Sequence, residues 1–152
     1  MTALHGDNEV AELERRIDGW LAEAQASNPL IEAVDRGEPG TLRWYVRLQG
    51  ESKDHTTIWL TLGQRTLQYE AYVLPAPEEN AAAVHELVLR QNNALVGAHF
   101  AIGVEDAVFL RGELPLVALD GEELDRIIGS IYAYVERFFP ALIRLAFASR
   151  IR

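Results

Sequence analysis

The sequence predicts an α+β domain with a mostly antiparallel five-stranded sheet and the element order α-β-β-β-α-β-β-α. Apolar residues recur every three to four positions in three segments, and they alternate with polar residues in five others. Strands grouped in runs, rather than alternating one by one with helices, are typical of α+β folds. The chain has 152 residues, 49% of them apolar and 24% charged, which fits a single folded domain.

Three segments have the apolar spacing of amphipathic helices. The first covers residues 8–26 and the second residues 78–96, and both have acidic residues in their first turn, where they suit the positive end of a helix dipole. The third is a long helix after Asp120, which together with Glu123 resembles a capping box. Pro140 lies inside this segment, and we expect it to kink the helix or to split off its last turns, because proline cannot donate the helical hydrogen bond.

Five segments alternate with a period of two and are predicted strands: residues 42–49, 55–62, 66–74, 99–103 and 107–114. The first three are joined by short loops, so we expect them to form an antiparallel meander. Residues 35–41 contain Gly and Pro and are predicted to be a turn-rich connector. The predicted sheet therefore has five strands.

The alternation in the meander sorts its side chains onto two faces. The apolar face is predicted to point into the core and consists of Leu42, Trp44, Val46, Leu48, Ile58, Leu60, Leu62, Leu67, Tyr69, Ala71 and Val73. The other face carries Tyr45, Trp59 and Tyr72 among charged residues. Two alternatives remain for these aromatic rings. Either a helix covers that face, or the face is a contact surface, since Trp, Tyr and Arg are enriched at protein interfaces.

Composition and motifs argue against several classes of function. The chain has 23 acidic and 14 basic residues and a net charge of −9, so we predict no nucleic-acid partner, because phosphates repel such a chain. It has no cysteine, no Gly-rich phosphate loop and four scattered histidines, so we predict no catalytic residues, no cofactor and no metal. Its apolar runs are too short for a membrane span and its first residues lack a secretory signal, which predicts a cytoplasmic protein without a membrane partner.

Five stretches of the sequence resemble one protein family: Trp44–Leu48, Trp59–Glu70, Pro75–Asn80, Phe100–Val108 and Leu124–Tyr134. Over about residues 40–147 the chain is similar to actinobacterial proteins of the YbjN family, a family described as bacterial sensory transduction regulators. The resemblance implies a fold like that of type III secretion chaperones, which are small, acidic, usually homodimeric proteins that bind extended segments of partner proteins. We expect one YbjN-like domain over residues 1–152, with residues 1–7 flexible.

We therefore expect a non-enzymatic protein-binding module of the bacterial cytoplasm, chaperone-like or regulatory, that acts in stress or sensory regulation. A homodimer is expected from the resemblance and from apolar residues of segment 78–96 outside its main stripe, namely Ala81, Ala82, Ala83 and Leu89. The expected protein-binding residues are Arg43, Tyr45, Arg47, Trp59, Glu70 and Tyr72.

The alternative function is a small-ligand-binding protein or an enzyme that uses Arg43, Arg47 and Glu70 on the aromatic face. Arg47 and Glu70 are equally compatible with a cross-strand ion pair, which contributes little on a surface. The residues alone do not decide between these interpretations.

Overall fold

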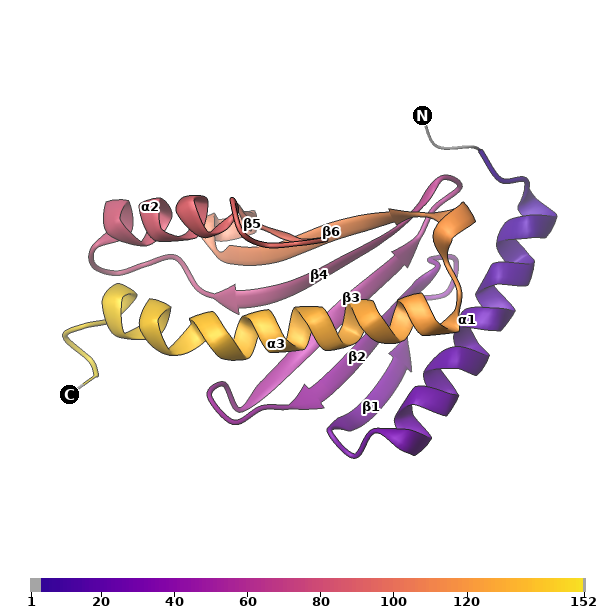
Figure 1. Cartoon of the computed structure of the whole chain (residues 1–152), viewed down its shortest axis with the longest axis horizontal. Helices are drawn as coiled ribbons and strands as arrows, with labels where there is room; N and C mark the ends of the chain where they lie inside the picture. Colours follow the sequence, from indigo (N-terminus) through magenta and orange to yellow (C-terminus); the bar gives the residue numbers. More distant parts are fainter. Residues whose placement is uncertain (1–3, 152) are drawn as a thin grey trace.

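The computed structural model describes residues 4–151 and has the predicted α+β architecture (Figure 1). The helices are α1 (Asp7–Ser27), α2 (Ala81–Gln91) and α3 (Gly121–Ala146). The strands are β1 (Ile31–Arg36), β2 (Arg43–Gln49), β3 (His55–Leu62), β4 (Thr66–Leu74), β5 (His99–Ile102) and β6 (Val108–Pro115). Two short 3₁₀ turns, η1 (Val104–Asp106) and η2 (Leu116–Ala118), follow β5 and β6. Part of the N-terminus that we predict to be flexible, residues 1–3, lies outside the described residues.

Within residues 4–151 the strands form one antiparallel sheet of six strands in the order β1-β2-β3-β4-β6-β5. The prediction of five strands missed β1, whose last two residues fall in the predicted connector 35–41. Only Ile31 of this strand is buried, and its register with β2 shifts between Ile31 and Ala33. A bulge on a mostly exposed edge strand removes the alternation by which a strand is recognised in the sequence.

Helix α2 is shorter than the predicted segment 78–96. Asn80, immediately before it, has a φ of 55°. This left-handed conformation cannot continue an α-helix toward the N-terminus, so the acidic residues before Asn80 belong to a loop. The helix ends at Gln91, and the chain turns there toward β5.

Helix α3 begins as predicted, because the Glu123 backbone N–H donates a hydrogen bond to Asp120 Oδ1 over 2.8 Å. The helix continues through Pro140 to Ala146, so the proline does not split off the last turns. Leu142 and Ala146 are fully buried beyond the proline. Their burial anchors the last turns to the core and offsets the missing hydrogen bond.

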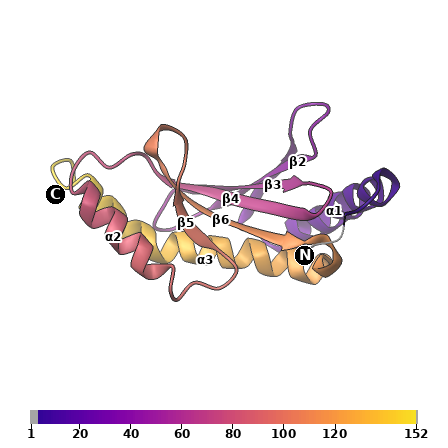
Figure 2. The same ribbon diagram turned by 90° about the horizontal axis from the view of Figure 1, so that it is seen from above.

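The helices pack against one face of the sheet. Helix α3 runs along this face, with α1 beside β1 at one end and α2 at the other (Figures 1 and 2). The predicted inward-facing residues of the meander are buried there, apart from Leu42, which is partly buried. Among the described residues, no helix covers the opposite face of the sheet (Figure 2).

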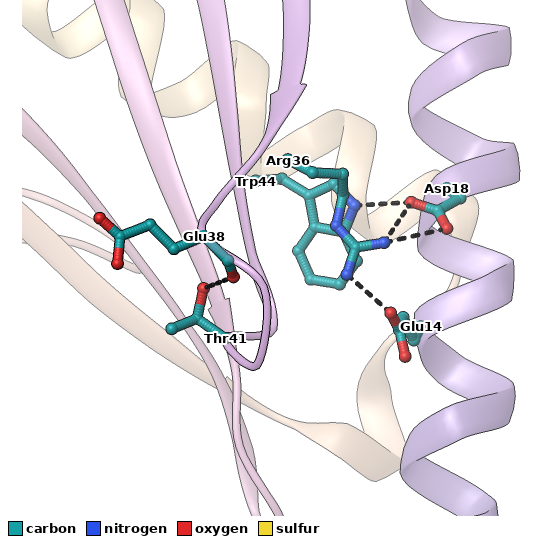
Figure 3. Close-up of polar contacts among 6 residues, drawn as sticks. All are labelled: Glu14, Asp18, Arg36, Glu38, Thr41 and Trp44. Atoms are coloured by element: carbon teal, nitrogen blue, oxygen red, sulfur yellow. Dashed lines mark hydrogen bonds and ion pairs between the residues drawn. The ribbon is translucent and has the colours of Figure 1, made fainter.

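A polar cluster fixes α1 to the sheet (Figure 3). The indole N–H of Trp44 on β2 donates to Asp18 Oδ1 on α1 over 2.7 Å. Arg36 on β1 donates to Glu14 Oε2 over 2.6 Å and to both Asp18 carboxylate oxygens over 3.3 Å, and its guanidinium lies 4.7 Å from the Trp44 ring centroid. The hydrogen bond to Glu14 holds the pKa of Arg36 above its ordinary value. Because these charged groups satisfy one another, we interpret the cluster as a structural anchor for α1.

Candidate protein-interaction surface

The uncovered side of the sheet brings the predicted binding residues together. We call this surface the open face and define it by Arg43, Tyr45, Arg47, Trp59, Thr61, Gln68, Glu70, Tyr72, Phe109, Arg111 and Glu113. The strand register pairs Trp59 on β3 with Tyr45 on β2 and with Glu70 on β4. Trp59 is 39% exposed and Tyr72 is 44% exposed. Of the two alternatives left by the sequence, a helix that covers this face is therefore excluded within residues 4–151, and the contact surface stays a prediction.

Two pairs of aromatic rings stabilise the open face. Tyr45 and Trp59 meet edge-to-face at 5.2 Å between centroids, and Tyr72 and Phe109 do so at 5.5 Å. Such pairs contribute about 0.5–1.5 kcal/mol beyond the area that they bury. The rings are thereby held in fixed positions, and side chains that are already ordered lose less entropy in an intermolecular contact.

Phe109 belongs to the open face, although sequence reasoning did not place it there. It is only 8% exposed, because Tyr72 packs against it and the Arg111 guanidinium lies 4.8 Å from its ring centroid. A Cβ atom on Gly103 would lie 2.4 Å from the Phe109 ring, so this turn requires glycine. The alternation of Phe109, Arg111 and Glu113 along β6 is the signal that could have assigned all three to this face.

The charged residues of the open face are mostly paired with partners other than those expected. Glu70 binds Arg111 on β6 over 2.7 Å, and Arg47 binds Glu32 on β1 over 3.3 Å. The suggested cross-strand pair between Arg47 and Glu70 is wrong, because β3 lies between their strands. Two of the three residues proposed for small-ligand chemistry therefore already have a partner of opposite charge.

Arg43 has a different environment. Its Nε donates a hydrogen bond to Thr61 Oγ1 over 3.0 Å, and its guanidinium lies 5.4 Å from the Trp59 ring centroid. No carboxylate within residues 4–151 forms an ion pair with it. Arg43 and Trp59 border a shallow depression of about 460 Å³ that extends across the strands to His99 and Arg111.

Tyr72 adds a neutral hydrogen-bond donor to the open face. Burial raises the pKa of its phenol above the ordinary value of 10.0, and the carboxylate of Glu105 raises it further. The phenol is therefore protonated at neutral pH. It can donate a hydrogen bond to a carbonyl or carboxylate oxygen of a partner.

One edge of the sheet is closed to further strands at its centre. The side chain of Asn92 accepts a hydrogen bond from the Phe100 backbone N–H over 2.7 Å and donates one to the Phe100 carbonyl over 3.2 Å. This amide occupies the outer side of β5, where a strand from another chain would otherwise pair. The backbone groups of Phe100 on this edge are therefore not available for pairing with another strand.

Neither a membrane-spanning helix nor a metal-binding cluster is present within residues 4–151. No helix there is both long and apolar enough to cross a lipid bilayer. No group of three or more histidine and acidic side chains lies close enough together there to hold a metal ion.

Solved structures share this arrangement of helices and sheet. A chain of the ExsC–ExsE complex matches with a TM-score of 0.59 at 17% identity, covering 88% of this chain and 95% of that one. A chain of the heterodimeric ExoU–SpcU complex, from the type III secretion system of Pseudomonas aeruginosa, matches with a TM-score of 0.55 at 20% identity, covering 82% and 95%. At these identities the likeness concerns the fold alone. It confirms the type III secretion chaperone-like fold that the resemblance implied.

The family follows from the sequence match. The model of the YbjN family, whose description reads "Putative bacterial sensory transduction regulator", matches residues 15–144. This chain belongs to the YbjN family, as its sequence signatures predicted.

Mycobacterial relatives share the sequence over most of this chain. It is 34% identical over 107 residues to uncharacterized protein Rv0487 of Mycobacterium tuberculosis (strain ATCC 25618 / H37Rv), which is 70% of this chain and 58% of that protein. It is 32% identical over 128 residues to uncharacterized protein ML2442 of Mycobacterium leprae (strain TN), which is 84% of this chain and 70% of that protein. The chain thus spans little more than half the length of the M. tuberculosis relative.

Proposed function

We propose that this chain is a non-enzymatic protein-binding module of the bacterial cytoplasm, chaperone-like or regulatory, that takes part in stress or sensory regulation. Its open face binds an extended segment of a partner protein, and Arg43, Tyr45, Arg47, Trp59, Glu70 and Tyr72 are its contact residues. The observation that carries the proposal is an uncovered sheet face with preorganised aromatic rings, of which Trp59 and Tyr72 are the most exposed. Large aromatic side chains that are already ordered are typical of interface hot spots.

The comparisons support a protein partner rather than a small substrate. Both structural neighbours were solved in complexes with protein partners. A small-ligand or enzymatic function would need the charged groups of the face for chemistry, but Arg47 and Glu70 are neutralised by Glu32 and Arg111. We therefore favour protein binding over the alternative.

Truncation of Trp59 tests the proposed surface. Trp59→Ala should weaken binding of a purified partner by about 2 kcal/mol or more, as for a central interface aromatic. Partners are first identified as the proteins that the immobilised wild type retains from an isotope-labelled native lysate, and each is then titrated in purified form. Val117→Ala is the matched control, because it truncates a side chain that is 75% exposed on η2, outside the open face. Equal partner affinity for wild type, control and Trp59→Ala would refute the open face as the binding surface.

We also propose that the module is a homodimer and that α2 forms its interface. Leu89 near the end of this helix is 71% exposed, and Ala81, Ala82 and Ala83 in its first turn are exposed as well. Small side chains let two helices approach closely. Light scattering should give twice the chain mass of 17.0 kDa for the wild type and the single mass for Leu89→Glu. A wild-type mass of 17.0 kDa at concentrations of tens of micromolar would refute the dimer.

A further inference from the structure

The open face carries three arginines, Arg43, Arg47 and Arg111. Arg47 and Arg111 each lie in an ion pair, with Glu32 and Glu70 respectively. Arg43 alone of the three has no carboxylate partner among the described residues. A cation that lies beside an aromatic ring without a counter-ion attracts an anion from outside the chain.

The free guanidinium is also oriented. Thr61 Oγ1 accepts the hydrogen bond from Nε, and the Trp59 ring lies 5.4 Å away. These two contacts leave the terminal Nη1 and Nη2 groups available as a planar fork. A carboxylate group matches this fork with two parallel hydrogen bonds, a geometry that lysine cannot provide.

The surroundings decide where a carboxylate can lie. The depression of about 460 Å³ next to Arg43 has room for a side chain or two of a polypeptide. Glu113 on β6 lines its far part, and Arg111 and Glu70 offset each other's charge, so the attraction for an anion is concentrated at the end near Arg43. Trp59 borders the same end and offers apolar area beside the charge.

We propose that Arg43 binds the side-chain carboxylate of an Asp or Glu residue in an extended partner segment, while Trp59 packs against an apolar side chain next to it. This inference rests on the proposed function and names the chemistry of its partner. The net charge of −9 repels an acidic segment at long range, so the carboxylate is recognised only on contact. We therefore expect the association rate to rise as salt screens this repulsion, with a Debye length of about 10 Å at 0.1 M. A basic segment is attracted by the negative net charge, so it would instead associate more slowly as the salt concentration rises.

The experiment selects the ligand without assuming its sequence. A random peptide library displayed on phage is panned against the wild-type protein, and the selected peptides are synthesised with both termini blocked. We expect enrichment of Asp or Glu beside apolar residues. Titration calorimetry should show that Arg43→Gln weakens binding by about 10-fold or more, the effect of losing a charge-assisted hydrogen-bonded pair. Changing the peptide's acidic residue to the corresponding amide should weaken binding to the wild type by the same factor.

Two further variants keep the test decisive. Arg15→Gln is the matched control, because it removes the same charge from a side chain that is 69% exposed on α1, outside the open face, and it should change the affinity by less than about 2-fold. Thr61→Val keeps the guanidinium but removes the oxygen that orients it. We expect it to weaken binding by about 3-fold, the size of an ordering cost for one side chain. Circular dichroism and urea unfolding check that each variant is folded. If Arg43→Gln is not folded, the affinities of Thr61→Val and of the amide peptide test whether Arg43 binds the carboxylate.

The outcomes separate this inference from the proposed function. Peptides that lose affinity for Trp59→Ala but bind Arg43→Gln as well as the wild type would overturn the role of Arg43 and leave the open face as a binding surface. Selection of basic peptides, or association that slows with salt, would overturn the carboxylate partner in the same way. A selection that yields no peptide dependent on Trp59 would overturn both proposals.

Discussion

Two tryptophans on neighbouring strands each lie beside an arginine, and their surroundings differ in one respect. Arg36 lies 4.7 Å from the ring centroid of Trp44, and Arg43 lies 5.4 Å from that of Trp59. In the first pair Glu14 and Asp18 from α1 complete the arginine's hydrogen bonds, and Trp44 is 1% exposed. In the second pair no carboxylate of the described chain does so, and Trp59 is 39% exposed.

The difference shows how one interaction serves two purposes. A helix that supplies both carboxylates turns the stacked pair at Trp44 into an anchor between α1 and the sheet (Figure 3). The corresponding pair of Arg43 and Trp59 has neither the carboxylates nor a covering helix, and it remains accessible to another molecule. Arg43 and Trp44 are consecutive residues of β2, so alternation along one strand separates the anchor from the site.

The strongest test of this comparison truncates each tryptophan in turn. Trp44→Ala should lower the free energy of unfolding by about 3–5 kcal/mol, because it leaves a cavity in the core. Trp59→Ala should lower it by only about 1–2 kcal/mol, because the ring loses its contacts with Tyr45 and Arg43 but is partly solvated and leaves no closed cavity. Urea unfolding of both variants measures the contrast. Similar losses for the two would mean that Trp59 also belongs to the core, and the open face would lose its main contact residue.

A smaller effect on stability is expected from removing the carboxylate of Asp18, which accepts hydrogen bonds from both Arg36 and Trp44. Asp18→Ala should cost about 1–3 kcal/mol of unfolding free energy, because it leaves the partly buried indole N–H of Trp44 without an acceptor. The control repeats the change in a Trp44→Phe background, where there is no N–H to satisfy. An equal cost in both backgrounds would contradict the anchoring role of this hydrogen bond.

The smallest effect concerns a tyrosine on each side of the sheet. Burial raises the pKa of Tyr69 on the covered face and of Tyr72 on the open face above 10.0. A raised folded-state pKa means that the stability linked to each phenol is complete below the unfolded pKa of about 10 and is lost as the pH rises through the folded pKa. Unfolding midpoints in urea, measured from about pH 9 to about pH 11, should therefore fall. The fall should be shallower in Tyr69→Phe and Tyr72→Phe, and an unchanged slope in both would refute the linkage.

The parts of the fold and of the candidate site that could be predicted are those in which apolar and polar residues alternate regularly. The two faces of the meander, and with them the site residues from Arg43 to Tyr72, follow from alternation along β2, β3 and β4. Strand β1 could not be predicted in this way, because a bulge and an exposed edge position disturb its alternation. Whether a helix covers the aromatic face depends on how the three helices pack, which a single sequence does not encode locally. The ion-pair partners of Arg47 and Glu70 were missed for a related reason, since both come from strands whose place in the sheet was not known.

The amide of Asn92 has a consequence for how copies of this chain behave at high concentration. By bonding both backbone groups of Phe100, it imitates a neighbouring peptide unit on the outer side of β5. A strand of only four residues with its centre occupied is a poor template for the stacked sheets of fibrils. One side chain thus makes this end of the sheet a poor site for the addition of strands, while Trp59 and Tyr72 stay exposed on the open face.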